Sequence, residues 1–77
     1  MTLDQWSPEP IYRQLAAILR AKIESGELGP GDKLPSEPRL QQEHGIARDT
    51  VRAAIRLLRE EGLVVTLPGR GTFVRPK

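Results

Sequence analysis

Two helical segments separated by only about three residues around Gly45 sharply limit the folds open to the chain. The first, residues 36–44, begins at Ser36, a residue type that caps helix N-termini. In the second, residues 48–61, the apolar side chains recur at intervals of three and four, at Val51, Ala54, Ile55 and Leu58. A connection this short predicts a helix-turn-helix.

The rest of the chain predicts one more helix and a hairpin. Residues 10–25 show helical periodicity, with Pro10 suited to the first helical position and Gly26 to a left-handed cap. The stretch "GELGPGDKLP" predicts a tight loop that leaves room for a short strand at residues 33–34. "LVVTL" and "TFV", joined by "PGRG", predict two short strands. The expected fold class is therefore mainly α with a small β-hairpin, a winged helix-turn-helix over residues 10–75 after a lead-in at 1–9.

Composition excludes several classes of protein. The 77 residues contain no cysteine and one histidine, so a disulfide framework, a thiolate nucleophile and a cysteine zinc site are excluded. No apolar run is long enough to span a membrane, and the N-terminus does not resemble a secretory signal. A phosphate-binding glycine loop and paired carboxylates in apolar surroundings are also missing. We therefore expect a cytoplasmic protein that is not an enzyme, takes no cofactor or metal and does not contact membranes.

Positive charge gathers in the C-terminal part of the chain. Residues 31–77 hold nine Lys and Arg against six Asp and Glu, and nine of the chain's twelve cations are Arg. Arginine suits bidentate recognition of phosphates and guanine edges, although genomic codon bias explains the preference equally well. Arg48, Arg52 and Arg56 advance by about 40° per step and form one stripe, with Arg59 between the first two. In a helix-turn-helix the second helix enters the DNA major groove, so Arg48 and Arg52, in its first two turns, are expected to contact DNA. The Arg56 and Arg59 side chains are expected to be mostly solvated.

Three stretches in order carry a family resemblance: "YRQLAAILRAKIESGELGPGDKLPSE", "HGIARDTVRAAIRLLREEGLV" and "GRGTFV". They resemble the N-terminal winged-helix domain of GntR-family bacterial transcriptional regulators from about Pro10 to Val74, nearly the whole chain. The resemblance implies that residues 48–61 enter the DNA major groove and that the wing, residues 68–72, lies at the minor groove. It also implies a homodimer on an inverted-repeat operator of double-stranded DNA.

The resemblance assigns roles residue by residue. Arg48 and Arg52 are implied to contact guanine or phosphate, and Thr50 to offer a hydroxyl or backbone N–H to a phosphate. The wing glycines match the tip that approaches the minor groove, and plain turn chemistry explains them as well. The full set of expected DNA contacts is Ser36, Arg39, Arg48, Asp49, Thr50, Arg52, Gly69, Arg70, Gly71 and Thr72.

The chain departs from the family pattern at three positions. Ala47 stands where the family usually has Ser or Thr, so the following helix should lack its side-chain cap. Pro38 occupies the place of a frequent DNA-contacting Arg, and Arg39 is shifted by one residue, which leaves contact with phosphate and simple solvation both open. Asp49 could accept from a cytosine amine, but we favour a role at the positive helix end.

Other features leave alternatives open. His44 is expected to pack partly beside the turn, and Trp6 to pack against the first helix or a neighbouring chain. A winged-helix domain can also bind proteins instead of DNA, but the arginine stripe and the Gly-Arg-Gly wing favour DNA. Family members normally carry a C-terminal effector-binding and dimerisation domain, and no effector site is visible in this sequence. We therefore expect an excised domain or an unusually short regulator, and Met1 mildly favours a natural start.

Overall fold

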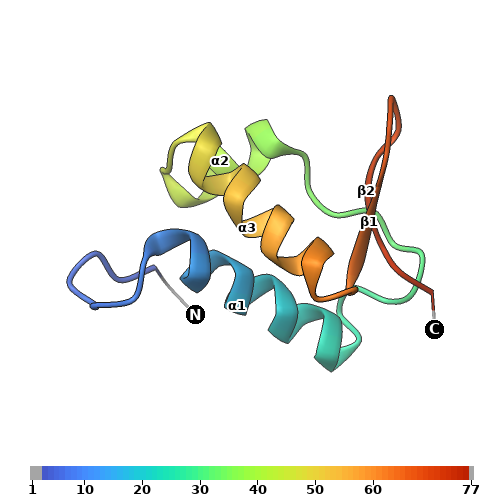
Figure 1. Ribbon diagram of the computed structural model, residues 1–77, viewed down its shortest axis with the longest axis horizontal. Coiled ribbons are helices and arrows are strands. Elements are labelled where there is room, and N and C mark those ends of the chain that lie inside the picture. Colours follow the sequence, from blue (N-terminus) through green and yellow to red (C-terminus); the bar gives the residue numbers. More distant parts are fainter. Residues whose placement is uncertain (1–2, 77) are drawn as a thin grey trace.

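A computed structural model describes residues 3–76 and shows three helices followed by a hairpin (Figure 1). The elements are α1 (Ile11–Ser25), α2 (Glu37–His44), α3 (Arg48–Glu60), β1 (Val64–Leu67) and β2 (Gly71–Val74). The expected winged helix-turn-helix is thus confirmed. In Figure 1, α1 lies along one side of α3, α2 crosses near the start of α3, and the hairpin stands at the end of α3.

The core lies where the three helices meet the base of the hairpin. The apolar face expected for α3 is buried, and it packs against α1 and α2. The most deeply buried large side chains come from all three helices: Leu15, Leu19, Leu40, Val51 and Leu58. Val64 of β1 joins the same cluster and closes it from the hairpin side. Burial of these residues supplies most of the stability of so small a domain.

The ends of the helices follow local capping rules. Ser36 caps α2, because its Oγ accepts a hydrogen bond from the backbone N–H of Arg39 at 3.2 Å. Gly45 ends the same helix with a φ of 62°, a left-handed conformation that favours glycine. Ala47 gives α3 no side-chain cap, as expected. Pro10 differs slightly from expectation, since it is the N-cap of α1, with a ψ of 146°, and Ile11 is the first helical residue.

The hairpin is short and is held to the loop before α2. β1 and β2 pair antiparallel from Val64 with Val74 to Leu67 with Gly71. The Arg70 N–H donates to the Leu67 carbonyl at 3.0 Å, and Gly69 has a φ of 75°, which is typical of a type II turn with proline, here Pro68, at its second position. Residues 33–34, where the loop left room for a short strand, form no strand. Lys33 forms only an isolated bridge with Phe73, because turns and Pro35 on either side leave too few extended residues.

The lead-in before α1 folds back on itself and leaves Trp6 outside. The Gln14 side chain accepts from the Asp4 N–H at 2.6 Å and donates to the carbonyls of Asp4 and Glu9, both at 2.8 Å. Leu3 packs on the core, while the Trp6 side chain is 96% exposed. The expectation that Trp6 packs against the first helix is therefore wrong. Among residues 3–76, no helix has the length and apolar character needed to cross a membrane.

Candidate nucleic-acid interface

The first two turns of α3 present charge to solvent. Arg48, Asp49 and Arg52 are exposed, while Val51, the residue before Arg52, is fully buried and anchors this end of the helix. The helix thus separates a core face from a charged face, as its periodicity predicts. Arg52 belongs to none of the ion pairs or side-chain hydrogen bonds within residues 3–76, so its guanidinium has all five donors available.

Arg48 has a loose partner. Its Nε lies 3.5 Å from Glu37 Oε1 at the start of α2, and its side chain remains 67% exposed. A contact this long and exposed contributes little and is easily exchanged for a phosphate or a base edge. The pair therefore holds the side chain near the junction of α2 and α3 without occupying its remaining donors.

Thr50 and Asp49 complete the start of α3. The Thr50 N–H donates to the Ala47 carbonyl at 3.1 Å. Of the two groups expected to reach a phosphate, the hydroxyl is therefore the one not used by the helix. Asp49 lies in the first turn, where a carboxylate stabilises the positive end of the helix dipole in the absence of a cap from Ala47. Asp49 also borders a hollow of about 290 Å³ with Arg52, Ala53 and Arg56.

Arg39 pairs with a glutamate on its own helix. Its Nε donates to Glu43 Oε1 at 2.8 Å, an (i, i+4) pair on α2, and the side chain is 72% exposed. Pairs of this kind contribute only about 0.3–0.5 kcal/mol, so the arginine can exchange partners at small cost. The one-residue shift from Pro38 therefore places Arg39 on the exposed surface of α2 with Glu43 as its partner.

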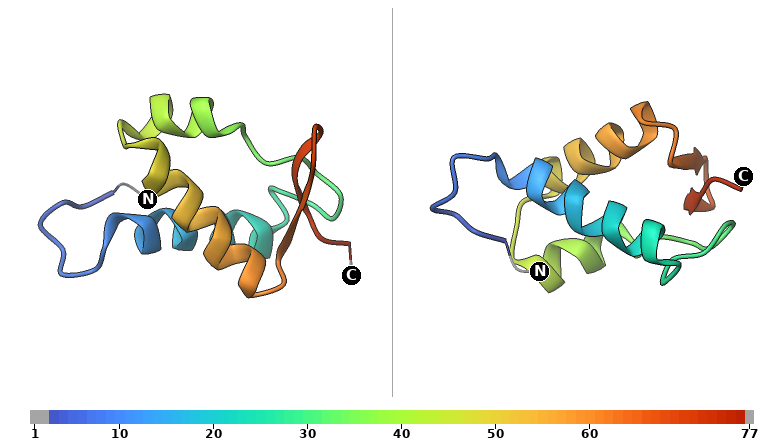
Figure 2. Two further views of the ribbon diagram at one scale, coloured as in Figure 1. Left: turned by 45° about the horizontal axis from the view of Figure 1, so that its top comes forward. Right: turned by 90° about the horizontal axis from the view of Figure 1, so that it is seen from below.

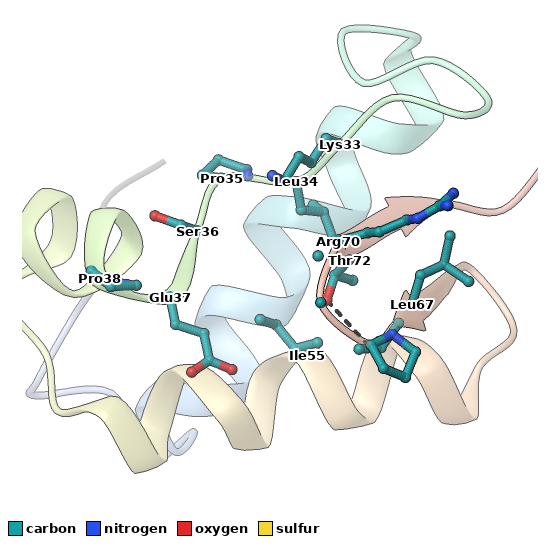
Figure 3. Close-up of a pocket in the computed structure, with 14 residues that line it drawn as sticks. Lys33, Leu34, Pro35, Ser36, Glu37, Pro38, Ile55, Leu67, Arg70 and Thr72 are labelled. Atoms are coloured by element: carbon teal, nitrogen blue, oxygen red, sulfur yellow. Dashed lines mark hydrogen bonds between the residues drawn. The ribbon is translucent and has the colours of Figure 1, made fainter.

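A second hollow, of about 410 Å³, lies between the start of α2, the middle of α3 and the hairpin. Figure 3 shows Ser36 and Glu37 on one side, Arg70 and Thr72 on the other, and Ile55 below them. The structure thus brings Ser36 together with the expected wing residues, which are Gly69, Arg70, Gly71 and Thr72. Arg52 and Asp49 border the other hollow. In Figure 1 and in the left view of Figure 2, the start of α3, helix α2 and the hairpin tip lie on the side of the molecule opposite α1.

Sequence reasoning missed Lys33, Thr66 and the partner of Arg59 at this interface. Lys33 borders the larger hollow and lies against Gly71, and Thr66 faces Thr72 across the hairpin. Arg59 is exposed, as expected, but its Nη1 also donates to Thr66 Oγ1 at 3.1 Å. No local pattern signals these contacts, because each depends on where the loop and the hairpin pack.

The arrangement is an exposed, arginine-bearing helix start beside a wing, and comparison with known proteins identifies it. Residues 11–74 match the profile of the family described as "Bacterial regulatory proteins, gntR family". The chain belongs to the GntR family. The match covers the helices and both strands, so the family resemblance inferred from the three sequence motifs is confirmed.

The proteins that the chain is similar to include regulators and solved DNA-binding domains. The chain is 48% identical over 67 residues to the mannosyl-D-glycerate transport/metabolism system repressor MngR of Escherichia coli, covering 87% of this chain but 28% of the repressor. The structure of YtrA from Sulfolobus acidocaldarius, a GntR-family transcription factor, matches with a TM-score of 0.91 at 38% identity, covering 99% of this chain and 80% of YtrA. The AraR DNA-binding domain in complex with operator ORE1 matches with a TM-score of 0.85 at 36% identity, covering 94% and 88% of the two chains.

These matches place the GntR-family chain among regulatory proteins with a DNA-binding winged-helix domain. Membership of a family of regulators confirms the expectation that the chain is not an enzyme. The chain spans less than a third of the length of MngR, so most of that repressor's sequence lies outside the match.

Proposed function

We propose that this GntR-family domain binds double-stranded operator DNA in a sequence-specific manner, with α3 in the major groove and residues 68–72 at the minor groove. The observation that carries the proposal is the exposed guanidinium of Arg52 in the second turn of α3, which forms no ion pair or side-chain hydrogen bond within residues 3–76. An α-helix is about 10–12 Å wide and the major groove about 12 Å, so an exposed helix start can reach base edges.

The polar side chains divide into those that would contact bases and those that would contact the DNA backbone. We assign base reading to Arg48 and Arg52, because a guanidinium can bind the O6 and N7 atoms of guanine with two hydrogen bonds. Ser36, Arg39 and the Thr50 hydroxyl lie at helix starts, where phosphate oxygens are favoured. Asp49 we assign mainly to the uncapped helix start, with acceptance from a cytosine amine as the second role.

The wing forms the other half of the interface. We assign Arg70 to the minor groove, where a cation at an exposed turn meets a concentrated negative potential. Gly69 and Gly71 allow the backbone of the turn to approach the sugar-phosphate chain closely. We assign Thr72, the residue after Gly71 on β2, to donate to a phosphate at the edge of the groove.

We further propose that residues 10–75 act as one DNA-binding unit and that two copies bind the two halves of an inverted repeat in the bacterial cytoplasm. The AraR DNA-binding domain, a similar domain solved in complex with operator ORE1, supports DNA as the partner. A two-fold operator would match the symmetry of a pair of domains. Effector control would then belong to sequence that the longer relatives carry beyond the matched part.

Selection from a random DNA library, followed by titration of the selected duplex and a scrambled one at two salt concentrations, tests the proposal. Arg52→Ala should weaken binding to the selected duplex by about 1–3 kcal/mol and relax preference at one base pair. Arg13→Ala is the matched control, because it removes one exposed charge from α1, on the opposite side. Equal, weak affinity of wild type and Arg52→Ala for both duplexes would overturn the base-reading role.

A further inference from the structure

Arg59, in the last turn of α3, connects the helix to both strands of the wing. Its Nη1 donates to Thr66 Oγ1 on β1 at 3.1 Å. Thr66 in turn lies 3.2 Å from Thr72 on β2, hydroxyl to hydroxyl, and the two are partners in the strand register. Figure 3 marks this hydroxyl pair at the wall of the larger hollow. A continuous chain of hydrogen bonds therefore runs from α3 across the hairpin.

The exposed half of the hairpin has little else to hold it against α3. Only the first residue of β1, Val64, is buried, and Val65 to Leu67 are exposed. β2 is attached on its outer edge to the loop before α2, through Leu34 N–H to the Thr72 carbonyl and Gly31 N–H to the Val74 carbonyl, both at 2.8 Å. Within residues 3–76, the Arg59 bond is the side-chain hydrogen bond that links α3 to the exposed part of β1.

The chemistry of the three groups favours one direction for this chain. A guanidinium only donates, so Thr66 Oγ1 accepts from Arg59 and its own hydrogen is available to Thr72, although either hydroxyl can be the donor of the second bond. When Thr66 donates to Thr72, the Thr72 hydrogen is left for an outside acceptor, such as a phosphate oxygen. A charge-assisted bond at the start of the series also strengthens the bonds that follow.

We propose that Arg59 is a positioning residue, which sets the wing against α3 through Thr66 and orients the Thr72 hydroxyl toward the DNA backbone. This inference rests on the proposed function, since it concerns how α3 and the wing reach neighbouring grooves together. Arg59 itself need not touch DNA. Its charge is used within the domain, whereas the guanidinium of Arg52 has no side-chain partner among residues 3–76.

The test compares Arg59→Met, Thr66→Val and the double variant on the selected duplex. Methionine keeps an unbranched apolar side chain without a donor, and valine keeps the shape of threonine without its hydroxyl. Each single variant should weaken binding by about tenfold, the size expected when one charge-assisted hydrogen bond is lost. The double variant should be no weaker than either single one, because both changes remove the same connection.

Footprints distinguish positioning from a general loss of affinity. At saturating protein, both variants should lose protection of the minor groove from hydroxyl radicals beside the wing. Protection of guanine N7 from methylation in the major groove should persist. Arg59→Lys, which keeps a charged donor on a long side chain, should restore part of the minor-groove protection. Retention of the wing footprint in Arg59→Met and Thr66→Val would overturn the inference.

Arg56→Met is the matched control for charge. Arg56 lies about one turn earlier on α3, is exposed, and takes part in no ion pair or side-chain hydrogen bond within residues 3–76. Arg56→Met should reduce the salt dependence of binding at least as much as Arg59→Met does. It should leave the protection of the minor groove from hydroxyl radicals beside the wing intact. If Arg59 acted as a direct phosphate contact, Arg59→Met and Arg56→Met would behave alike and Thr66→Val would bind as wild type, which would overturn the positioning role.

A measurement without DNA separates this inference from the proposed function. In the free chain, NMR order parameters of the amides at residues 69–72 should fall in Arg59→Met and Thr66→Val relative to Arg56→Met. Urea midpoints of the three variants should be similar, because the Arg59 bond is exposed and outside the core. A library selection that yields no sequence would refute the proposed function, whereas unchanged order parameters would refute the role of Arg59.

Discussion

Gly69 and Gly71 occupy the same turn but meet different constraints. Gly69 has a φ of 75°, and a Cβ built there would have no atom within 4 Å. Gly71 has a φ of 127°, and its Cβ would lie 2.6 Å from Lys33 Cε. The end of the lysine side chain can move aside, so the backbone conformation is the larger cost. Asparagine adopts the left-handed region of Gly69 but not the wider angle of Gly71.

Replacement of each glycine by asparagine should therefore have unequal effects. Gly69→Asn should change the free energy of unfolding by less than about 1 kcal/mol, whereas Gly71→Asn should lower it by about 1–3 kcal/mol, because its φ is nearly restricted to glycine. Urea denaturation followed by circular dichroism measures both. Equal losses at the two positions would contradict this account and would point to the tightness of the turn as a whole.

Ala47 is the opposite case, a helix N-cap whose side chain has no hydrogen-bond acceptor. Its φ of −71° and ψ of 153° are those of a normal N-cap, but alanine has no acceptor for the free N–H groups of α3. Ala47→Ser should raise the free energy of unfolding by about 1 kcal/mol. Ala47→Val, which adds volume without an acceptor, is the control. Thermal denaturation checks both, and a serine variant no more stable than the valine variant would refute the capping argument.

At the scale of elements, α1 and α3 are joined by an ion pair as well as by the core. Arg20 of α1 donates from Nε and Nη2 to the Glu61 carboxylate, just after α3, at 2.8–3.0 Å. The two side chains are 30% and 36% exposed, so water screens much of the attraction. The pair fixes the end of α3, from which the chain turns at Gly62 into the wing.

Glu61→Gln should therefore lower the free energy of unfolding only modestly, by about 0.5–1 kcal/mol at low salt, and the loss should shrink at about 1 M salt. Glu60→Gln is the matched control, since Glu60 is exposed and forms no ion pair within residues 3–76. Urea denaturation at two salt concentrations measures the difference between them. Identical behaviour of the two variants would show that the pair contributes nothing to stability.

At the scale of the whole molecule, the domain is small relative to the DNA it is proposed to bind. Its extents are 35 × 26 × 20 Å, about the length of one turn of B-DNA along its longest axis. One copy is therefore proposed to cover one half-site, with α3 and the wing in adjacent grooves. Two copies on neighbouring half-sites must lie on the same face of the duplex to contact each other.

The length of the spacer between half-sites should control any gain in affinity from cooperative binding. Two copies should bind an inverted repeat more tightly than two separate half-sites, because the first copy raises the effective concentration of the second. Insertion of about five base pairs, half a turn, should abolish this gain, and insertion of about ten should restore part of it. Sedimentation and titration measure stoichiometry and affinity. Independent binding at every spacing would contradict a dimer on DNA.

Local sequence alone determined much of this protein. The capping chemistry of Ser36 and Gly45, the apolar repeat of α3 and the turn residues of the wing each act within a few residues, so helix limits and the hairpin were predictable. The exposure of Arg48 and Arg52 follows from the same periodicity. The roles assigned to them on DNA stay predictions.

Only the tertiary structure decided how distant segments meet. Lys33 lies against Gly71, and Arg59 donates to Thr66. Both contacts arise because the turn at Gly62 and the burial of Val64 in the core direct the hairpin back past the loop before α2. Trp6 stays outside because Gln14 ties the lead-in into its own fold. Side-chain partners separated in sequence depend on the placement of whole elements, and short-range propensity and periodicity do not contain that information.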